Sequence, residues 1–507
     1  CVDVSNPSTP VEMFFISDVN STWRDIKTWG DYAYITTEAN AGLLIVDLTD
    51  LTGNTFWHVS QFTNPTTGAS ISFTSSHNIY IDENGIAYIF GARNNGTPVA
   101  NRGAIFLDVN ANAIAPIYLG EWAGEYIHDG MARGDTMYAG CIYQGSLYIV
   151  DVSDKTNPQT IGQHATPNNF THNAWVSDDG NYVFTTDEQS DAYLAAYDIS
   201  NINNIQEVDR IQSNPGSNSI PHNTHVDGNF LITSYYRDGT IVHDITYPSH
   251  MIQVAYYDSY AGSGNGFNGC WGTYPFLSSG NIISSDRDSY NGKGVLNIYG
   301  RAFQQACYLS GNVIDGTNGN NISSTDITLL STTTSAQSNI IGDYQTAVVD
   351  SGTYQIIFSK SGYISDTLSI LLDNGIMTIL DAQLYPIGSG CTDPTACNYD
   401  PLADFDDGSC EWTSCAGCAN AAPTGLNATN VVQNRATINW DNMNDSLCMI
   451  DQYRIKYSGD GGATWTTKTM GQPVNSCLWA AQNTDKLILN LTPSTTYQYQ
   501  MKAWYCD

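Results

Sequence analysis

Four histidines occupy equivalent positions in a repeated pattern, and they are the residues best suited to chemistry. Each is followed by Asp or Asn, and the four are His77, His128, His172 and His222. A neutral imidazole nitrogen is a good ligand for zinc and for copper. Four such side chains facing one channel could hold an ion of this kind, and His225 and His243 could add to the set. The pattern predicts a candidate zinc or copper site.

The same pattern has an interpretation that involves no ion. A His followed by Asp or Asn at the start of every repeat could form one structural hydrogen bond that ties neighbouring units together. Repeat proteins copy structural residues as faithfully as functional ones. The pattern is therefore typical of a structural element, since residues found in every repeat usually serve the fold, and the metal site stays open beside it.

Two charged pairs could contact a ligand. Arg24 precedes Asp25 in the first repeat, and Arg237 precedes Asp238 in a later one. Placed at the mouth of a channel, Arg24, Asp25 and Arg237 could bind an anionic ligand or a sugar. The alternative is that each pair is a local ion pair, which is common on protein surfaces and contributes little.

An acidic segment forms a second candidate metal site. Its five aspartates fall within 15 residues, and they are Asp393, Asp400, Asp404, Asp406 and Asp407. Calcium takes six to eight oxygen ligands in irregular geometry, so the segment predicts a calcium site. The spacing does not match the twelve-residue EF-hand loop. The alternative is an acidic linker that disulfides hold together without an ion.

Sequence motifs of common enzymes are absent from the chain. It has no Gly-x-Ser-x-Gly elbow, no His-Glu-x-x-His and no phosphate-binding Gly-Lys-Ser/Thr loop. The acidic pair Asp187-Glu188 follows a predicted strand, and we expect it in a solvated loop. These observations favour a protein that is not an enzyme, with a metal-dependent enzyme in the channel as the alternative.

A closing-strand pattern explains how the histidines are positioned. Its clearest copies are Leu44-Ile45-Val46-Asp47 and Tyr148-Ile149-Val150-Asp151, and looser copies recur up to about residue 303. The spacing of about 43 to 61 residues is typical of β-propeller blades. Six fuller units follow an initial segment that matches the second half of a unit, so the chain starts within a blade. The first strand of each blade lines a central channel, which would place the histidines at one height.

Two stretches in this region carry a family resemblance. Trp23-Arg24-Asp25-Ile26 and Gly269-Cys270-Trp271-Gly272 resemble the first and last blades of the choice-of-anchor B family, which is built from LVIVD repeats. The resemblance covers residues 1–303. It implies a β-propeller on exported, surface-anchored proteins, mostly from marine Bacteroidetes, and export through a type 9 system. It implies no defined biochemical activity.

The rest of the chain resembles three small modules. Residues 309–386 resemble a carboxypeptidase regulatory-like β-sandwich, which carries no catalytic residues. Residues 390–418 resemble a Cys- and Asp-rich repeat of the same bacteria. Residues 422–507 resemble a fibronectin type III domain, with Trp440 in the core and Tyr497 as the corner tyrosine, whose hydroxyl returns to the backbone.

Composition limits the compartment and the partners. The chain has 18 Lys and Arg against 50 Asp and Glu, a net charge of −32, which argues against nucleic acid and anionic membranes as partners. It has no apolar run of about 18 residues, so no transmembrane segment is predicted. Clustered cysteines predict disulfides in an oxidising compartment, with a zinc knuckle at Cys415 and Cys418 as the alternative. The cluster is Cys391, Cys397, Cys410, Cys415 and Cys418, and Cys448, Cys477 and Cys506 follow it.

We therefore expect an all-β protein with a six- or seven-bladed β-propeller followed by small β-sandwich domains. It would be extracellular or on the outer cell surface. The propeller would recognise a glycan, a surface protein or another copy of the chain, and the later modules would act as spacers. The alternatives are a subunit of an extracellular filament or surface layer, and the metal-dependent enzyme.

Overall fold

The computed structural model describes residues 1–262, 266–412, 422–444, 449–470 and 483–506. The fold is all-β, and the only helical element in these ranges is the short 3-10 helix η1 (Ala100–Arg102). No helix in the described ranges is long and apolar enough to cross a membrane. The chain divides into two compact units. The first is mainly Cys1–Tyr308, and the second takes most of the chain after it.

Six antiparallel sheets follow one another along the first unit, five with four strands and the last with three. The first three sheets contain β3 (Ile26–Trp29), β4 (Tyr32–Ile35), β5 (Leu43–Asp47) and β6 (Phe56–Val59); β9 (Asn78–Ile81), β10 (Ile86–Phe90), β13 (Ala104–Asp108) and β14 (Ile117–Trp122); and β15 (Asp129–Arg133), β16 (Thr136–Cys141), β17 (Ser146–Asp151) and β18 (Gln159–Ala165). The next three contain β19 (Thr171–Val176), β20 (Tyr182–Asp187), β21 (Leu194–Asp198) and β22 (Gln206–Ile211); β23 (Thr224–Asp227), β24 (Phe230–Tyr235), β25 (Gly239–Asp244) and β26 (Ile252–Tyr257); and β27 (Gly269–Tyr274), β28 (Ile282–Tyr290) and β29 (Lys293–Tyr299).

Three two-stranded pairs complete this unit. They are β1 (Val2–Asp3) with β2 (Val11–Glu12), β7 (Gln61–Thr63) with β8 (Ser70–Ser72), and β11 (Arg93–Asn94) with β12 (Thr97–Pro98). In the described ranges β1 pairs with β2 and with no other strand. The choice between six and seven blades therefore stays a prediction.

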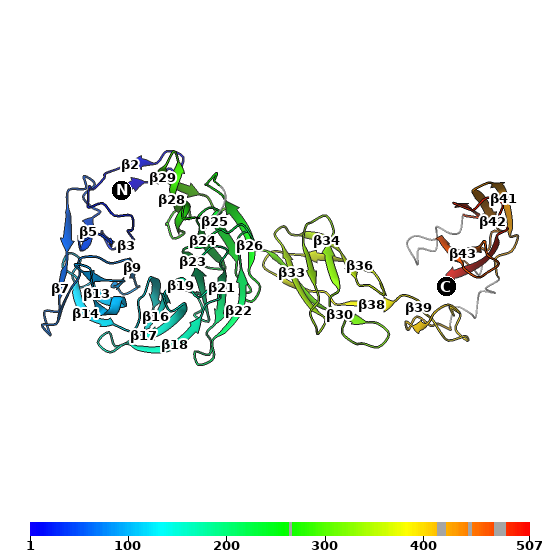
Figure 1. The fold of residues 1–507 in the computed structure, drawn as a ribbon, viewed down its shortest axis with the longest axis horizontal. Helices are drawn as coiled ribbons and strands as arrows, with labels where there is room; N and C mark the ends of the chain where they lie inside the picture. Colours follow the sequence, from blue (N-terminus) through cyan, green and yellow to red (C-terminus); the bar gives the residue numbers. More distant parts are fainter. Residues whose placement is uncertain (263–265, 413–421, 445–448, 471–482, 507) are drawn as a thin grey trace. The chain divides into compact units, whose positions relative to one another are not determined.

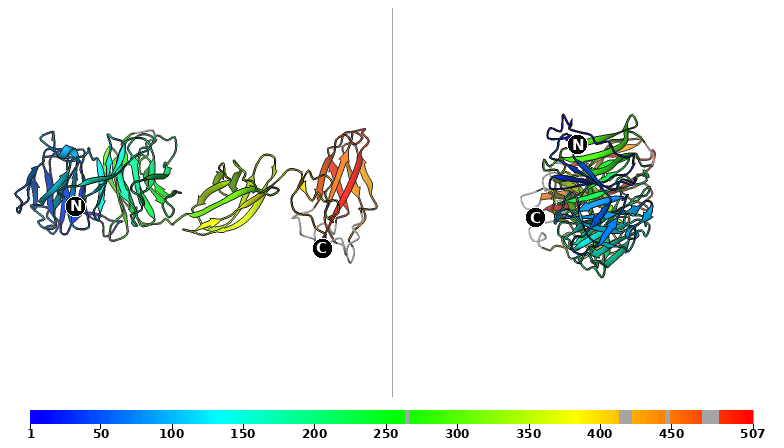
Figure 2. Two further views of the ribbon diagram at one scale, coloured as in Figure 1. Left: turned by 90° about the horizontal axis from the view of Figure 1, so that it is seen from below. Right: turned by 90° about the vertical axis from the view of Figure 1, so that its left-hand side faces the viewer.

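The six sheets are arranged around a common centre, as in a propeller. Figure 1 shows β3, β9, β19 and β23 toward the centre, and β14, β18, β22 and β26 on the outside. From the side, the strands of these sheets run roughly along the axis (Figure 2). Each first strand contacts the first strand of the next sheet, from β3 through β9, β15, β19 and β23 to β27. Equivalent residues at the start of successive sheets therefore lie next to one another.

The third strands explain why the sheets pack side by side. Leu43, Leu44, Ile45 and Val46 of β5 are all buried, although alternate residues of a strand point to opposite faces of its sheet. Both faces of β5 must therefore be covered, which requires packing on either side. The same holds for β13, where Ala104 to Leu107 are buried without a break. The LVIVD-like pattern is thus the mark of a strand buried on both faces.

The second unit contains two larger sheets in its first part. One comprises β33 (Asp343–Val348), β30 (Cys307–Asp315), β38 (Ala382–Pro386), β35 (Tyr363–Ile364) and β37 (Met377–Ile379). The other comprises β32 (Ser335–Gln337), β31 (Asp326–Leu329), β34 (Gly352–Ser359) and β36 (Asp366–Leu372).

Three smaller sheets follow. They are β39 (Ser389–Gly390) with β40 (Phe405–Asp406); β41 (Asn427–Val432), β42 (Arg435–Asn439) and β45 (Asp485–Leu489); and β44 (Thr466–Met470), β43 (Met449–Ser458) and β46 (Gln498–Cys506). Trp440 is 4% exposed in the core of the last two sheets. The Tyr497 hydroxyl accepts a hydrogen bond from the Thr492 N–H at 2.9 Å, which is the backbone contact expected of a corner tyrosine.

The cysteine cluster contains a disulfide between Cys391 and Cys410. Cys397 and Cys506 are also disulfide-bonded. Cys391 and Cys410 are therefore not ligands of a zinc knuckle. Cys415, Cys418, Cys448 and Cys477 lie outside the described residues.

Candidate functional site

The four predicted histidines form one row at the starts of successive first strands. His77, His128 and His222 come just before β9, β15 and β23, and His172 lies in β19. Ring centroids are 3.8 Å apart for His77 and His128, 4.6 Å for His128 and His172, and 4.2 Å for His172 and His222. The structure therefore brings all four imidazoles together at one level of the axis.

The preceding sheet fixes the backbone of several of these residues. The Thr36 hydroxyl donates to the His77 carbonyl at 3.4 Å, and the Thr186 hydroxyl donates to the His222 carbonyl. At the corresponding place before His172 stands Gly140, where a Cβ would lie 2.6 Å from the His172 carbonyl oxygen. The same position at the end of the second strand thus holds Thr in two sheets and Gly in a third. The Thr hydroxyl bonds to the backbone of the histidine in the next sheet, and Gly leaves room for that backbone.

Two of the acidic or amide residues of the motif, Asp25 and Asn173, each accept a hydrogen bond from the backbone of the next sheet. Asp25 follows Arg24, and its Oδ2 accepts a hydrogen bond from the Ile79 N–H of the next sheet at 3.3 Å. Asn173 follows His172, and its Oδ1 accepts from the Thr224 N–H of the next sheet at 3.1 Å. In this motif the contact that ties neighbouring sheets together is therefore made by the acidic or amide residue, as Asp25 and Asn173 show. The histidine beside it is left to face the axis.

Glu188 completes the cluster, contrary to the expectation of a solvated loop. Asp187 is fully buried, and its carboxylate accepts hydrogen bonds from the Thr166 hydroxyl at 2.6 Å and the Asn168 N–H at 2.7 Å. The Glu188 side chain is 13% exposed, and its two oxygens lie 3.7 Å from Nε2 of His172 and 3.7 Å from Nε2 of His222. Here the end of β20 points to the axis.

Neighbouring side chains orient the first two histidines of the row. His77 Nδ1 lies 2.8 Å from Glu38 Oε1, and His128 Nδ1 lies 2.6 Å from the Tyr126 hydroxyl. The Arg102 guanidinium lies over the Tyr126 ring, 3.5 Å from its centroid. Because each contact occupies Nδ1, Nε2 of both histidines is left to face other groups.

Burial sets the charge of the cluster. It lowers the pKa of His128, His172 and His222 well below the usual value, and neighbouring imidazoles lower it further. Burial also raises the pKa of Glu188 to about 7, although the hydrogen bond from the Tyr236 hydroxyl opposes this shift. The three histidines are neutral at neutral pH, which is the form that coordinates metals.

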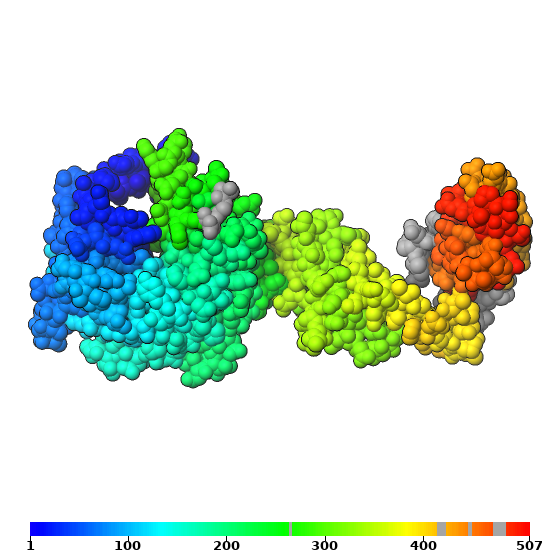
Figure 3. Space-filling view, viewed as in Figure 1, coloured from blue at the N-terminus to red at the C-terminus, as the bar shows by residue number. Residues whose placement is uncertain are grey.

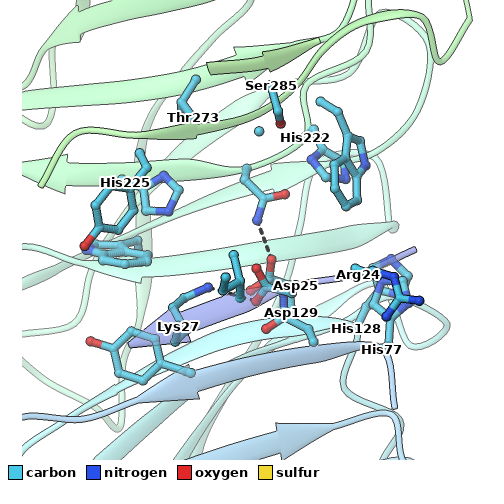
Figure 4. A pocket seen from close by; sticks show the side chains of 18 of the residues that line it. Arg24, Asp25, Lys27, His77, His128, Asp129, His222, His225, Thr273 and Ser285 are labelled. Atoms are coloured by element: carbon cyan, nitrogen blue, oxygen red, sulfur yellow. Dashed lines mark hydrogen bonds and ion pairs between the residues drawn. The ribbon is translucent and has the colours of Figure 1, made fainter. Parts of the chain in front are cut away.

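The histidine row borders a cavity of about 1390 Å³ within the first unit. His77, His128 and His222 line it, and His172 is buried between the last two. Figure 4 shows Arg24, His77 and His128 at one end of the view and Asp25 and Asp129 nearer the middle. In the space-filling view an opening lies between the dark blue N-terminal residues and the green last sheet (Figure 3).

Polar and aromatic groups line the rest of this cavity in two further levels. In the middle level the Asn223 amide donates to Asp129 Oδ2, and burial raises the pKa of Asp129 to about 6. At the next level the Trp175 ring packs against Tyr80 at 5.8 Å and Phe276 at 5.7 Å. A ligand in the cavity would therefore meet imidazoles, then carboxylate and amide groups, then aromatic rings.

The other predicted ligand-binding residues separate into two groups. Arg24 and Asp25 line the cavity, but they do not pair with each other: Arg24 pairs with Asp18 at 2.8 Å, and Asp25 pairs with Lys27 at 2.8 Å. Arg237 is not among the lining residues, and its guanidinium lies over the Tyr260 ring at 5.1 Å.

The two additional histidines also differ. His225 lines the cavity in the aromatic level, where its ring lies 4.5 Å from that of Trp175. His243 lies in β25, fully buried away from the cavity lining, so it does not join the row. Burial lowers the pKa of His243 to about 3.

Four of the five aspartates of the predicted calcium segment, Asp393, Asp400, Asp406 and Asp407, cap local turns. Asp393 Oδ1 accepts hydrogen bonds from the N–H and hydroxyl of Thr395, and Asp406 and Asp407 accept from the N–H groups of Gly408 and Ser409. Within the described ranges the one group of three or more potential ligands close enough for a metal is His128, His172 and Glu188. The calcium site at Asp393, Asp400, Asp404, Asp406 and Asp407 stays a prediction.

Residues just after the second strands were missed. Glu38, Tyr143 and Glu188 follow β4, β16 and β20 and line the cavity, and Tyr236 follows β24 and bonds to Glu188. Their common signal is position: each stands one to three residues beyond the strand that pairs with the first strand. Aligning the repeats at the second strand would have found them.

Comparison with protein-family models matches residues 1–18, 22–56 and 138–166 to the LVIVD repeat. The chain carries LVIVD repeats. Together with the radial arrangement of all-β sheets, they support a propeller-type fold. No curated protein matches the chain.

Several solved structures share a distant likeness with this LVIVD-repeat chain. A Lactobacillus plantarum protein is 14% identical with a TM-score of 0.41, covering 55% of this chain and 83% of its own. The Myceliophteria thermophila Cps50 (Swd1) β-propeller domain is 10% identical with a TM-score of 0.36, covering 55% and 83%. A putative 6-phosphogluconolactonase from Bacteroides uniformis is 15% identical with a TM-score of 0.34, covering 46% and 70%.

Proposed function

We propose that the first unit is the ligand-binding head of an exported or surface-displayed protein, and that its ligand is a glycan held in the axial cavity. The observation that carries this proposal is the cavity itself. Its volume of about 1390 Å³ exceeds the range typical of small-molecule sites. It offers room for more than one sugar ring.

The distribution of charge supports the same proposal. Five of the 18 Lys and Arg side chains in the chain line this cavity. They are Arg24, Lys27, Arg102, Arg133 and Arg287. Carboxylates such as Asp25 and Asp129 line it as well, so the cavity presents both hydrogen-bond donors and acceptors. Ligand hydroxyl groups need both kinds of partner, since each hydroxyl donates one bond and accepts others.

Aromatic rings at the junction of the first and last sheets supply the apolar contact. Trp23 and Trp271 have ring centroids 5.9 Å apart, and the Arg287 guanidinium lies 5.4 Å from the Trp23 centroid. Flat aromatic faces beside charged groups suit a sugar, which presents an apolar face of C–H groups and a polar edge. Trp271 is the residue we expect to contact the ligand.

The rest of the chain suits an extracellular setting. The disulfide between Cys391 and Cys410 is compatible with an oxidising compartment. The carboxypeptidase regulatory-like and fibronectin type III modules would act as spacers, and choice-of-anchor B membership would place the protein on the surface of a Bacteroidetes cell. The six sheets would belong to a six- or seven-bladed propeller.

A glycan array followed by calorimetry tests the proposal. The full chain should bind at least one class of glycan, and Trp271→Ala should weaken that binding by about five- to thirtyfold, because about 1–2 kcal/mol of contact energy is lost with a stacking ring. Trp412→Ala is the matched control, since Trp412 is 55% exposed and lies outside the cavity. Binding that survives Trp271→Ala, or no binding to any glycan, would contradict the proposal.

A filament or surface-layer subunit is the second candidate. In the described ranges β29 is the edge strand of a three-stranded sheet, and β1 and β2 pair only with each other. Exposed strand edges can pair with another chain. Light scattering of the purified chain tests this candidate: concentration-dependent assembly favours it, and a stable monomer up to high concentration contradicts it.

A further inference from the structure

We propose that His128, His172 and Glu188 form a binding site for a divalent transition-metal ion of the zinc and copper class. This inference goes beyond the proposed glycan-binding role and can hold if that role fails, because the metal alone is its probe. A site of two histidines and one carboxylate matches the donor atoms that these ions prefer.

Geometry is the first argument. One ligand atom from each of the three residues can be chosen so that all lie within 4.8 Å of one another. A metal–ligand bond of about 2.1 Å places tetrahedral ligand atoms about 3.4 Å apart, so each atom must move inward by roughly 1 Å or less.

The second argument is an unsatisfied polar group. His172 is 2% exposed, and neither of its ring nitrogens has a hydrogen-bond partner of normal geometry in the described part of the chain. A buried polar atom left without a partner costs about 1–3 kcal/mol, so such atoms are rare in folded proteins. A metal ion bonded to Nε2 of His172 would satisfy one of these two nitrogen atoms, and the nearest carboxylate oxygen of Glu188 lies 3.7 Å from that nitrogen.

The residues behind the ligands are the third argument. The Tyr126 hydroxyl lies 2.6 Å from His128 Nδ1, and the Tyr236 hydroxyl donates to Glu188 Oε1 at 2.7 Å. Each contact occupies the atom that would point away from the ion and leaves His128 Nε2 and Glu188 Oε2 free. Metal ligands in proteins are usually oriented by outer partners of this kind.

The flanking histidines explain how a fourth ligand could be provided. The His77 ring lies 3.8 Å from that of His128, and the His222 ring lies 4.2 Å from that of His172. His77 Nδ1 contacts the Glu38 carboxylate at 2.8 Å, an arrangement that leaves Nε2 as the coordinating atom. The cavity on the same side admits water as an alternative fourth ligand.

The test uses the chain of residues 1–507 without a tag, dialysed against a chelator and free of glycan. Zinc is titrated by calorimetry, bound zinc is counted by elemental analysis, and cobalt is added as a spectroscopic probe of the coordination geometry. We expect one zinc per chain at the axial site. Cobalt should give the visible absorption typical of nitrogen and oxygen ligands.

Variants assign the site. Glu188→Gln keeps the size of the side chain and should weaken zinc binding by about tenfold or more, as should His128→Gln. His164→Gln is the control, because His164 lies on β18 outside the cavity. Two variants of different ligands keep the test decisive if one fails to fold. No zinc binding, or binding unchanged in both ligand variants, would overturn the proposal, and glycan binding is measured separately on the metal-free chain.

Discussion

The side-chain oxygen of Asn173 accepts a hydrogen bond from the backbone N–H of Thr224 at 3.1 Å and so joins β19 to β23. The first residue of the repeated motif, His172, faces the row of imidazoles, and the second, Asn173, holds the next sheet in place. One dipeptide therefore carries both the site and the contact that positions the neighbouring histidine, His222.

Asn173→Ala should destabilise the first unit. The substitution leaves the buried Thr224 N–H without its partner, which costs about 1–3 kcal/mol of the free energy of unfolding. The melting temperature of the first unit should fall by several degrees in calorimetry. Asn84→Ala, on an exposed turn, is the control and should change the melting temperature little. Equal effects of the two substitutions would remove the assigned role of Asn173.

Gly140→Ala should weaken zinc binding without touching a ligand. A Cβ at Gly140 would lie 2.6 Å from the His172 carbonyl oxygen, so the backbone that carries His172 must shift. Productive coordination tolerates little displacement, and we expect zinc affinity to fall by about tenfold. Gly300→Ala is the control, since a Cβ there meets nothing within 4 Å. Titration of both variants with zinc checks the prediction, and unchanged affinity in Gly140→Ala would contradict it.

His243→Leu should flatten the dependence of stability on pH. Burial lowers the pKa of His243 to about 3, so the folded state keeps this side chain neutral while the unfolded chain takes up a proton below about pH 6.5. The wild type therefore loses stability as the pH falls from about 6.5 toward 3, by up to about 1.4 kcal/mol per pH unit from this residue.

Urea unfolding of both proteins at pH 7, 6, 5 and 4 measures this effect. The free energy of unfolding of the wild type minus that of His243→Leu should decrease with each step down in pH, because other titrating groups cancel in the difference. A difference that stays constant would show that His243 is not held neutral by its surroundings.

The double substitution Cys391→Ser and Cys410→Ser should make the acidic segment less stable and easier to cleave. The disulfide closes a loop with a sequence separation of 19, and a loop of this size stabilises its segment by about 3 kcal/mol. Cleavage by chymotrypsin between residues 391 and 410 should become at least about tenfold faster in the double variant. Cys1→Ser is the control, since Cys1 is exposed and free. Equal cleavage rates would mean that other contacts hold the segment.

The fold was largely predictable because burial of the third strand in each sheet imposes an apolar sequence pattern that recurs along the chain. A strand buried on both faces must be apolar at every position. This is why the run Leu44-Ile45-Val46 can be recognised in the sequence as a buried strand. The number of blades was not predictable, since it depends on how the edges of β1 and β29 are used. The pairing of these edges is made by backbone hydrogen bonds, which do not depend on the identity of the side chains and so cannot be read from the sequence.

The candidate site was predictable in part. The four histidines recur at one position of the repeat, so the sequence points to their row. Glu188 follows a second strand, at a position that Glu38 and Tyr143 also occupy in other repeats, but the sequence does not show that its side chain turns toward His172. His243 looked equivalent by residue type, but it lies on a third strand, whose side chains face neighbouring sheets.

Anomalous diffraction at the zinc edge, from crystals of the full chain grown with zinc, tests the central claim most directly. The account predicts one strong peak on the propeller axis, within bonding distance of His128, His172 and Glu188. No peak on the axis, or a peak bound only by surface carboxylates, would contradict it.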